Sequence, residues 1–192
     1  MKRNVILAGV GGQGILTIAA AIGMAAVESG LKLKQAEVHG MSQRGGAVQS
    51  HLRISDREIA SDLIPEGSCD MILSVEPMEG LRYLPYLAPG GWLVTAMKPL
   101  RNIGDYPQEE ELFPEIRKVT NHLLVDAAEI AGKLGSQKVS NIVMLGAALP
   151  NLGMNQEKLE QAIQALFSRK GEKIVKMNIS ALRAGKEAAG RR

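Results

Sequence analysis

The chain alternates short apolar runs with longer segments of helical periodicity, which is the rhythm of an α/β protein. Residues 5–8 are apolar and predict a buried strand, and residues 12–28, rich in Ala, Ile and Leu, predict the helix that follows it. A second strand is predicted over residues 32–38. The next segment, HGMSQRGG (39–46), has the polar and glycine-rich composition of a loop.

Val48, Ser50, Leu52 and Ile54 then alternate with more polar positions, as on a strand with one buried face. The polar positions Gln49, His51 and Arg53 would line the other face at intervals of about 7 Å. The turn residues SDRE lead into a further apolar segment, 59–64. We therefore predict a β-hairpin that pairs these two segments.

The second half of the chain continues the alternation of strands and helices, although its last third is helical throughout. Strands are predicted at 69–75, at 90–96 and at the start of the segment 121–135, which then passes into a helix. Further helices are predicted near Pro77 and over 107–119, with an interruption at Pro114. The last three predicted helices cover 138–149, 155–168 and 171–190. Gly146, inside an apolar helix, indicates close packing against a neighbour. The 192 residues are expected to form a single doubly wound α/β domain with a mostly parallel sheet.

The first predicted turn contains Gly9-x-Gly11-x-x-Gly14, the spacing of a dinucleotide fingerprint. Such a turn exposes amide N–H groups at the positive end of a helix and can accept a phosphate. Glu37, at the end of the second predicted strand, stands where NAD-binding proteins place an acidic residue for the ribose. The alternative is that the glycines serve close packing between the first strand and the first helix, and the sequence alone leaves both readings open.

The loop after the second strand offers a second candidate site. Ser42, Gln43 and Arg44 precede Gly45 and Gly46, and the planar guanidinium of arginine suits a carboxylate or a phosphate. The two glycines would let the backbone approach that ligand or another subunit. The competing interpretation is an ordinary loop and an amphipathic strand with a solvated polar face.

Composition narrows the function classes. Hydrophobic residues make up 45% of the chain, but aromatic residues only 3%, and the net charge is +3 without a basic stripe, so nucleic-acid binding is not expected. The single cysteine, Cys69, can supply neither an internal disulfide nor the four thiolates of an iron–sulfur cluster. His39, His51 and His122 lack a metal-ligand spacing, and no paired carboxylates or Ser–His–Asp order can be assigned.

The N-terminal segment resembles a signal peptide, with basic residues before an apolar stretch. The glycines at positions 11, 12 and 14 interrupt that stretch where a strand-to-helix turn needs them, which favours a retained first strand. Residues 15–27 are too few to span a bilayer. A cytoplasmic protein without membrane attachment is expected.

Four segments carry a resemblance to a known family. They are GVGGQGI (9–15), EVHGMSQRGGAVQSHLRIS (37–55), CDMILSVEPMEGLR (69–82) and NIVMLGAAL (141–149). Together they resemble the gamma-type domain of 2-oxoacid:ferredoxin oxidoreductases, over nearly the whole chain. Arg44-Gly45-Gly46 matches the arginine–diglycine signature of that family, and HGMSQ before it is most similar to the beta subunit of indolepyruvate ferredoxin oxidoreductase, where pyruvate-type members commonly carry a Gly-Pro pair.

The resemblance implies a Rossmann-like frame and a role as the small subunit of a complex. Such a complex decarboxylates a 2-oxoacid on thiamine diphosphate, passes electrons through 4Fe-4S clusters to ferredoxin, and releases an acyl-CoA. Both the thiamine and the clusters would lie in a large partner subunit, since this chain has no cysteine set and its GDY at 104–106 fails the Gly-Asp-Gly thiamine motif. The isolated chain is expected to bind no cofactor and to be inactive.

Within this family the glycine turn is mainly architectural, so the turn and the following loop are expected to face the large subunit and to help enclose its substrate or coenzyme A channel. No catalytic or metal-binding residue is expected in this chain. An NAD(P)-binding oxidoreductase and a small anion-binding regulatory module are the alternatives. The residues expected at the channel or subunit interface are Gly11, Gly12, Gln13, Gly14, His39, Ser42, Gln43, Arg44, Gly45, Gly46 and His51.

Overall fold

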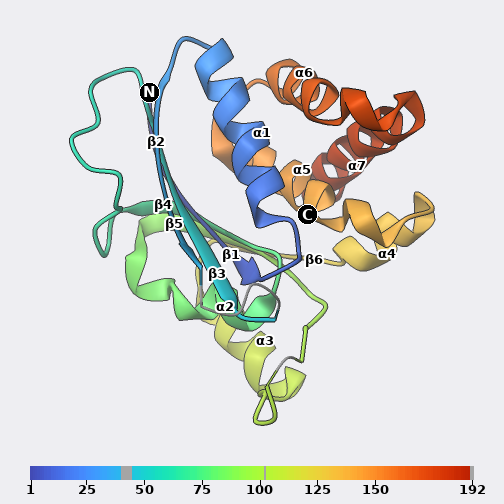
Figure 1. Cartoon of the computed structure of the whole chain (residues 1–192). Helices are drawn as coiled ribbons and strands as arrows, with labels where there is room; N and C mark the ends of the chain where they lie inside the picture. The colour runs from blue at the N-terminus through green and yellow to red at the C-terminus, as the bar shows by residue number, and fades with distance from the viewer. Residues whose placement is uncertain (40–44, 102, 191–192) are drawn as a thin grey trace.

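A computed structural model describes residues 1–39, 45–101 and 103–190, with the side chain of His39 excepted. Its centre is a six-stranded sheet in the order β2-β3-β1-β4-β5-β6 (Figure 1). Neighbouring strands pair in parallel from β1 to β6, whereas β3 runs antiparallel to both β1 and β2. The strands are β1 (Lys2–Val10), β2 (Lys32–His39), β3 (Ala47–Ser55), β4 (Cys69–Ser74), β5 (Leu87–Ala96) and β6 (His122–Val125).

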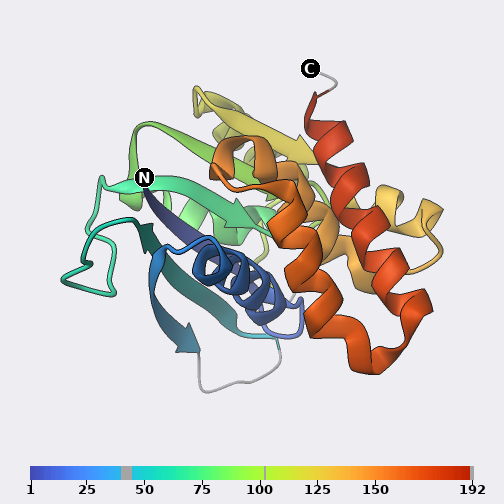
Figure 2. The same cartoon turned by 90° about the horizontal axis from the view of Figure 1, so that it is seen from above.

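Helices cover both faces of the sheet, as the doubly wound architecture requires. Figures 1 and 2 show α1, α5, α6 and α7 stacked on one face, while α2 and α3 lie on the other. The α-helices are α1 (Ile15–Glu28), α2 (Pro77–Arg82), α3 (Glu109–Lys118), α4 (Ala127–Lys133), α5 (Ser140–Leu152), α6 (Gln156–Phe167) and α7 (Glu172–Gly190), with 3-10 turns η1 (Leu84–Tyr86), η2 (Gln137–Val139) and η3 (Ser168–Lys170). Across the described ranges, none of these helices is long and apolar enough to cross a bilayer.

Strand β1 is the most buried segment because a helix layer covers each of its faces. Every residue from Asn4 to Val10 is buried. Leu7 belongs to the core beneath α1 and α5, and Ile6 belongs to the smaller core beneath α2 and α3. A continuous apolar run is what a doubly covered parallel strand requires, and this explains why the N-terminal segment resembles a signal peptide. The segment is the central strand of the fold.

The α/β class, the mostly parallel sheet and the helical C-terminal third are confirmed. The predicted hairpin between residues 48–54 and 59–64 was wrong. Strand β3 pairs with β2 before it and with β1, whereas residues 59–64 form no strand. In that segment Ile59 and Ile64 turn inward and are buried, and this burial accounts for the apolar spacing without any strand.

Two smaller predictions, the interruption at Pro114 and the start of the first helix, were also wrong. Helix α3 continues through Pro114 without a break, because Leu112 and Ile116 are buried on its inner face and hold the helix in place. Because proline has no amide hydrogen, α3 lacks one backbone hydrogen bond at this residue. Helix α1 begins at Ile15 and not at residue 12, because Gly14 adopts a left-handed conformation with φ of 81°.

Helices α5 and α7 cross at unusually short range because both carry a glycine at the contact. A β-carbon built on Gly146 would lie 2.0 Å from the backbone oxygen of Leu182, and one built on Gly185 would lie 1.9 Å from that of Val143. No side chain fits there, so the close packing predicted from Gly146 is confirmed.

This contact yields a stability prediction. We expect Gly185→Ala to lower the free energy of unfolding by about 3 kcal/mol, because the methyl group must push α5 and α7 apart. Urea unfolding followed by circular dichroism measures the effect. Gly190→Ala in the same helix is the matched control, since no atom lies within 4 Å of a β-carbon at that position. Equal stability of the two variants would contradict the packing described.

Candidate functional site

The carboxyl ends of β1, β4, β5 and β6 meet at one edge of the sheet, where proteins of this architecture bind their ligands. The glycine turn after β1 lies at this edge. The amide of Gly11 donates to the carbonyl oxygen of Gly46 at 2.8 Å, and the amide of Gly45 donates to the carbonyl oxygen of Gly11 at 3.5 Å. These bonds extend the β1–β3 ladder past the strands and join the two predicted glycine segments. We call Gly11–Gly14 together with Gly45 and Gly46 the glycine rim.

Gln13 closes the turn from within. Its side-chain oxygen accepts from the amide of Val10 at 2.8 Å, and its side-chain nitrogen donates to the carbonyl oxygen of Val75 at 3.4 Å. The side chain thus spans the ends of β1 and β4. A β-carbon on Gly9 would lie 2.5 Å from Val75 and 3.0 Å from the Gln13 oxygen, so Gly9 is needed for packing at this point.

Asn141 fastens the turn to the helical layer. Its amide nitrogen donates to the carbonyl oxygen of Gly14 at 3.2 Å, and a β-carbon on Gly14 would lie 2.3 Å from that same nitrogen. Because Gly14, the third glycine of the fingerprint, has no side chain, there is room beside it for the Asn141 side chain of α5. Gly9 and Gly14 of the fingerprint thus each have a packing neighbour that accounts for them.

The position of β3 separates Glu37 from the turn. In a dinucleotide-binding fold the second strand lies directly beside the first, so that its acidic residue reaches the ribose. Here β3 lies between β1 and β2, which places Glu37 about two strand spacings, or roughly 10 Å, from β1. The geometry that would hold a nicotinamide cofactor is absent from the described part of this edge.

Three hollows surround the turn. A shallow cavity of about 270 Å³ lies on the rim itself, between Val10, Leu16 and Val48. A second, of about 210 Å³, lies between Gln13, Lys98 and the start of α5. The largest, of about 540 Å³, lies behind the turn and is lined by residues of α1, η2, α5 and α7. Leu16, which is 47% exposed, presents an apolar side chain beside the rim.

The structure brings together six of the predicted site residues, Gly11, Gly12, Gln13, Gly14, Gly45 and Gly46. The backbone of His39 ends β2 opposite Val48, close to the same edge. Ser42, Gln43 and Arg44 lie outside the described residues.

His51 is not part of the rim. It pairs with Ile6 in mid-sheet, is only 4% exposed, and its Nδ1 accepts from the amide of Ile64 at 3.0 Å. Its ring and the ring of Tyr86 pack nearly perpendicular to each other, with centroids 5.6 Å apart. Burial lowers the pKa of His51 below its ordinary value of 6.5. The histidine is thus a neutral anchor for the segment that follows β3.

The same segment also binds Arg53 on the polar face of β3. Arg53 donates from Nη1 to the carbonyl oxygens of Ser61 and Leu63 at 2.8 and 3.0 Å, and from Nε to Asn4. Gln49, His51 and Arg53 share one face, as the alternation predicts, but His51 and Arg53 on this face hold a chain segment and are not open to a ligand.

A buried carboxylate, Glu76, organises this edge. Glu76 is fully buried, caps α2 through the amide of Glu79 at 2.8 Å, and accepts from the amide of Leu100 at 3.2 Å. It also accepts from the hydroxyl of Tyr106. The cap was recognisable from the acid one residue before Pro77, whereas the loop contacts join residues distant in sequence and gave no local signal.

Within the described ranges, no group of three or more His, Cys, Asp or Glu side chains could hold a metal ion. Burial raises the pKa of the Cys69 thiol to about 12, so this sulfur stays protonated at neutral pH. It is a core side chain of β4.

Comparison with known proteins gives a consistent result. Residues 4–188 match the family model described as pyruvate ferredoxin/flavodoxin oxidoreductase. The indolepyruvate oxidoreductase subunit IorB of Archaeoglobus fulgidus is 38% identical over 194 residues, which covers 96% of this chain and 94% of the relative.

Solved structures agree. The gamma subunit of a keto/oxoacid ferredoxin oxidoreductase from Geobacter sulfurreducens is 26% identical, with a TM-score of 0.71 and 99% of each chain covered. The 2-oxoglutarate:ferredoxin oxidoreductase from Magnetococcus marinus, solved with 2-oxoglutarate, coenzyme A and succinyl-CoA bound, has the same fold over 100% of this chain and 31% of its own, with a TM-score of 0.80 at 20% identity.

The burial of His51 predicts a pH dependence. Above pH 6.5 the imidazole is neutral in both the folded and the unfolded chain, but below it the unfolded chain binds a proton that the folded chain resists. The stabilisation is therefore complete above pH 6.5, and the free energy of unfolding falls as the pH drops from 6.5 towards the lowered pKa.

His51→Phe should remove this part of the slope. It should also lower the stability at pH 8 by about 1–3 kcal/mol, because the amide of Ile64 loses its acceptor. Urea unfolding of both proteins from pH 8 to pH 5.5 tests this. An unchanged slope in the variant would show that His51 does not titrate as its burial implies.

Proposed function

Because this chain belongs to the pyruvate ferredoxin/flavodoxin oxidoreductase family, we propose that it is the small subunit of a complex that oxidises indolepyruvate or a related aryl pyruvate and reduces ferredoxin. The observation that carries the proposal is the 38% identity to an indolepyruvate oxidoreductase subunit along nearly the whole of both chains. The product would be the corresponding acyl-CoA.

The glycine rim supports a role in assembly. Its two segments are joined by the hydrogen bond from Gly11 to Gly46, and Asn141 fastens the turn to α5. Leu16 leaves an apolar side chain exposed next to the rim. A rigid, glycine-lined backbone with an apolar neighbour suits close contact with another protein. We propose that the large subunit contacts this rim, and that the segment from Ser42 to Gly46, including Arg44, extends the same contact.

The proposal assigns the chemistry to the large subunit. Thiamine diphosphate would supply the carbanion chemistry there, and 4Fe-4S clusters would carry the electrons. In this chain, Cys69 is a buried thiol with a raised pKa, which suits the core and not a cluster. The complex is expected to work in the cytoplasm.

Coenzyme A is the ligand most closely connected with the rim in this proposal. A solved protein of the same fold holds coenzyme A and succinyl-CoA. Arg44, with a guanidinium suited to phosphate or carboxylate, and the glycines beside it would help enclose the channel through which the coenzyme reaches the large subunit.

Two geometric features disfavour the nicotinamide alternative. Gln13 fills the space between the ends of β1 and β4, where a pyrophosphate would approach the turn. The interposed β3 keeps Glu37 away from any ribose bound there. Neither feature conflicts with a role as a subunit of a complex.

Activity of the co-expressed pair tests the function directly. The chain would be produced with and without the large thiamine- and iron–sulfur-containing subunit from the same organism, and dye reduction would be measured with coenzyme A and a panel of 2-oxoacids. We expect turnover only from the pair, with the highest kcat/KM for an aryl pyruvate. Dye reduction by the chain alone, or a clear preference for pyruvate, would contradict the proposal.

Assembly through the rim has its own test. We expect Leu16→Glu to raise the Kd of the two subunits at least about tenfold, because a charge would enter an apolar contact, while the fold should tolerate an acid in the first turn of α1. Val27→Glu is the control. Val27 is 63% exposed on the same stripe of α1 but roughly 16 Å further along the helix. Equal weakening by both variants would place the contact elsewhere.

A further inference from the structure

A cavity of about 520 Å³ lies at the end of the sheet opposite the glycine rim. Its floor is formed by the start of β1 and the end of β3, and its outer wall by residues 56–60 of the segment that follows β3 (Figure 1). Strand β1 runs from this cavity to the rim, which places Asn4 roughly 23 Å from Gly11. The volume lies within the usual range of ligand pockets, and the distance separates the cavity from any ligand of the turn.

The strand register gathers positive charge at this floor. Two rows of directly opposed residues cross β1, β3 and β2, and they consist of Lys2, Ser55 and Lys32 and of Asn4, Arg53 and Lys34. Opposed residues on one face of a sheet lie about 5 Å apart, and like charges in such positions destabilise the pair. Arg53 and Lys34 are in this relation. An anion bound at the floor would offset the repulsion between them.

The carboxylates of the chain offset only part of this charge. Glu58 accepts from Lys32, and Asp56 accepts from the amino group of Met1. The hydrogen bond from Lys32 lowers the pKa of Glu58, and the charge of Lys34 adds to this effect. Both acids stand on the exposed segment 56–60 and are already engaged by these partners.

Two cations of the wall are left without a carboxylate. Among the described residues neither Lys2 nor Arg57 forms an ion pair, although the charge of Arg57 contributes to the lowered pKa of Asp56. Arg53 is committed to the carbonyl oxygens of Ser61 and Leu63, so it adds charge to the cavity without being free for a contact. Clefts lined by charge of one sign concentrate ligands of the opposite sign.

Hydrogen-bond donors line the same wall. Ser55 is 8% exposed and accepts from the amide of Arg57 at 2.9 Å, while its own hydroxyl hydrogen has no acceptor in the described part of the chain. The backbone amides of Glu58, Ile59 and Ala60 likewise donate to no acceptor within the described ranges. Successive free amides of a turn segment are groups that hold anions in proteins.

We propose that this cavity binds a compact polyvalent oxyanion, with Lys2 and Arg57 as the ionic contacts and with Ser55 and the amides of residues 58–60 as hydrogen-bond donors. Two cations favour a ligand with two or more negative groups, because a single charge would leave one of them unpaired. The site goes beyond the proposed function and shares no residue with the rim. Phosphate and carboxylate groups have this chemistry in common, so pyrophosphate and citrate are both probes.

The experiment is amide hydrogen exchange of the full chain at low salt, with pyrophosphate or with citrate. Exchange is resolved along the chain, so binding of either anion elsewhere is seen separately. We expect each anion that binds to slow the exchange of residues 58–60 at least about fivefold in the unaltered chain, because a bound ligand stabilises the segment it contacts. The test variant Lys2→Gln/Arg57→Gln should lose this protection. Both side chains are exposed, so the fold should tolerate the change.

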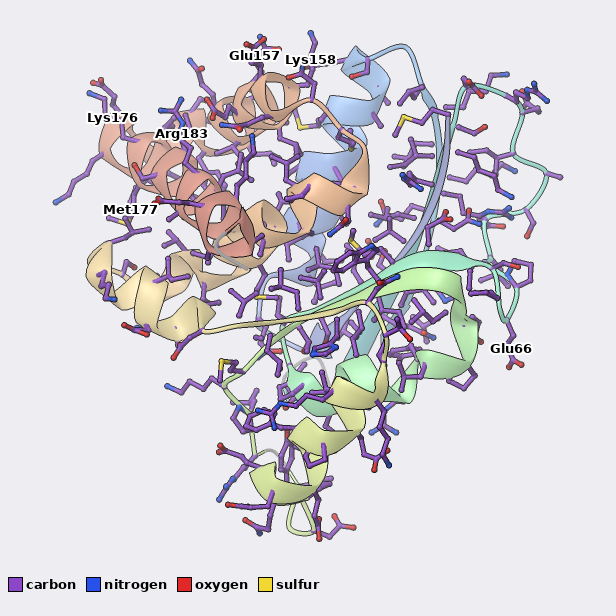
Figure 3. All side chains as sticks on the ribbon, turned by 180° about the vertical axis from the view of Figure 1, so that it is seen from behind. Glu66, Glu157, Lys158, Lys176, Met177 and Arg183 are labelled. Atoms are coloured by element: carbon purple, nitrogen blue, oxygen red, sulfur yellow. The ribbon has the colours of Figure 1, made fainter. Side chains whose placement is uncertain are left out.

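The matched control is Lys158→Gln/Arg117→Gln. It also removes one lysine and one arginine that form no ion pair among the described residues, and neither belongs to the cavity wall. Figure 3 shows the side chain of Lys158 on the outside of α6, in the helical layer across the sheet from the segment that carries Glu66. The control should keep the full protection of residues 58–60.

Equal protection by pyrophosphate and citrate would identify multiple negative charge as the recognised property, and a clear preference for one would identify phosphate or carboxylate as the group. Either result supports the site when the loss is confined to the test variant. Unchanged exchange of residues 58–60 with both anions would overturn it, and so would equal protection in the test variant or equal loss in the control. The same protection by acetate at equal ionic strength would also overturn it, because screening by salt would then explain the effect.

Discussion

The pairing of β3 with β1 is the constraint on which the function of this edge depends. Nine consecutive residue pairs, from Lys2 opposite Ser55 to Val10 opposite Ala47, place an antiparallel strand where a dinucleotide-binding fold has its second parallel strand. The ladder then continues into the loop through the bond from Gly11 to Gly46. The turn keeps the glycine spacing of a nucleotide site, but β3 has displaced the strand that would complete such a site.

The contacts inside the turn also disfavour a nucleotide site. Gln13 ties the ends of β1 and β4 together, and Asn141 ties the turn to α5, so the glycines admit protein atoms at close range. Glu76 does the same for the loop that follows β5. Each group satisfies backbone donors or acceptors that would otherwise be left unpaired near the sheet edge. The result is a backbone surface with little freedom to rearrange, which suits an interface more than a catalytic centre.

Local patterns predicted the elements well and their partners poorly. Strands β1 and β4 and helices α1, α5 and α6 follow from apolar runs and periodicity, and Asn155 caps α6 as its position indicates. The alternation over residues 48–54 identified a strand, but an amphipathic strand does not reveal which neighbour it pairs with, because pairing is a long-range choice. For the same reason, the sequence could not show that residues 59–64 cover His51 and turn a polar face into a buried one. The joining of the two glycine segments was expected only through family resemblance, and the roles of Asn141 and Glu76 in the site appeared only in three dimensions.

Amide hydrogen exchange with and without the large subunit tests the central claim most directly, namely that the glycine rim is a surface for protein contact. In the complex, residues 10–17 and 45–48 should exchange at least about tenfold more slowly than in the isolated chain. The first half of α6, residues 156–161, lines none of the hollows around the turn and should be unchanged. Equal exchange at the rim in both states, in a complex that turns over, would show that the large subunit binds elsewhere and would contradict this account.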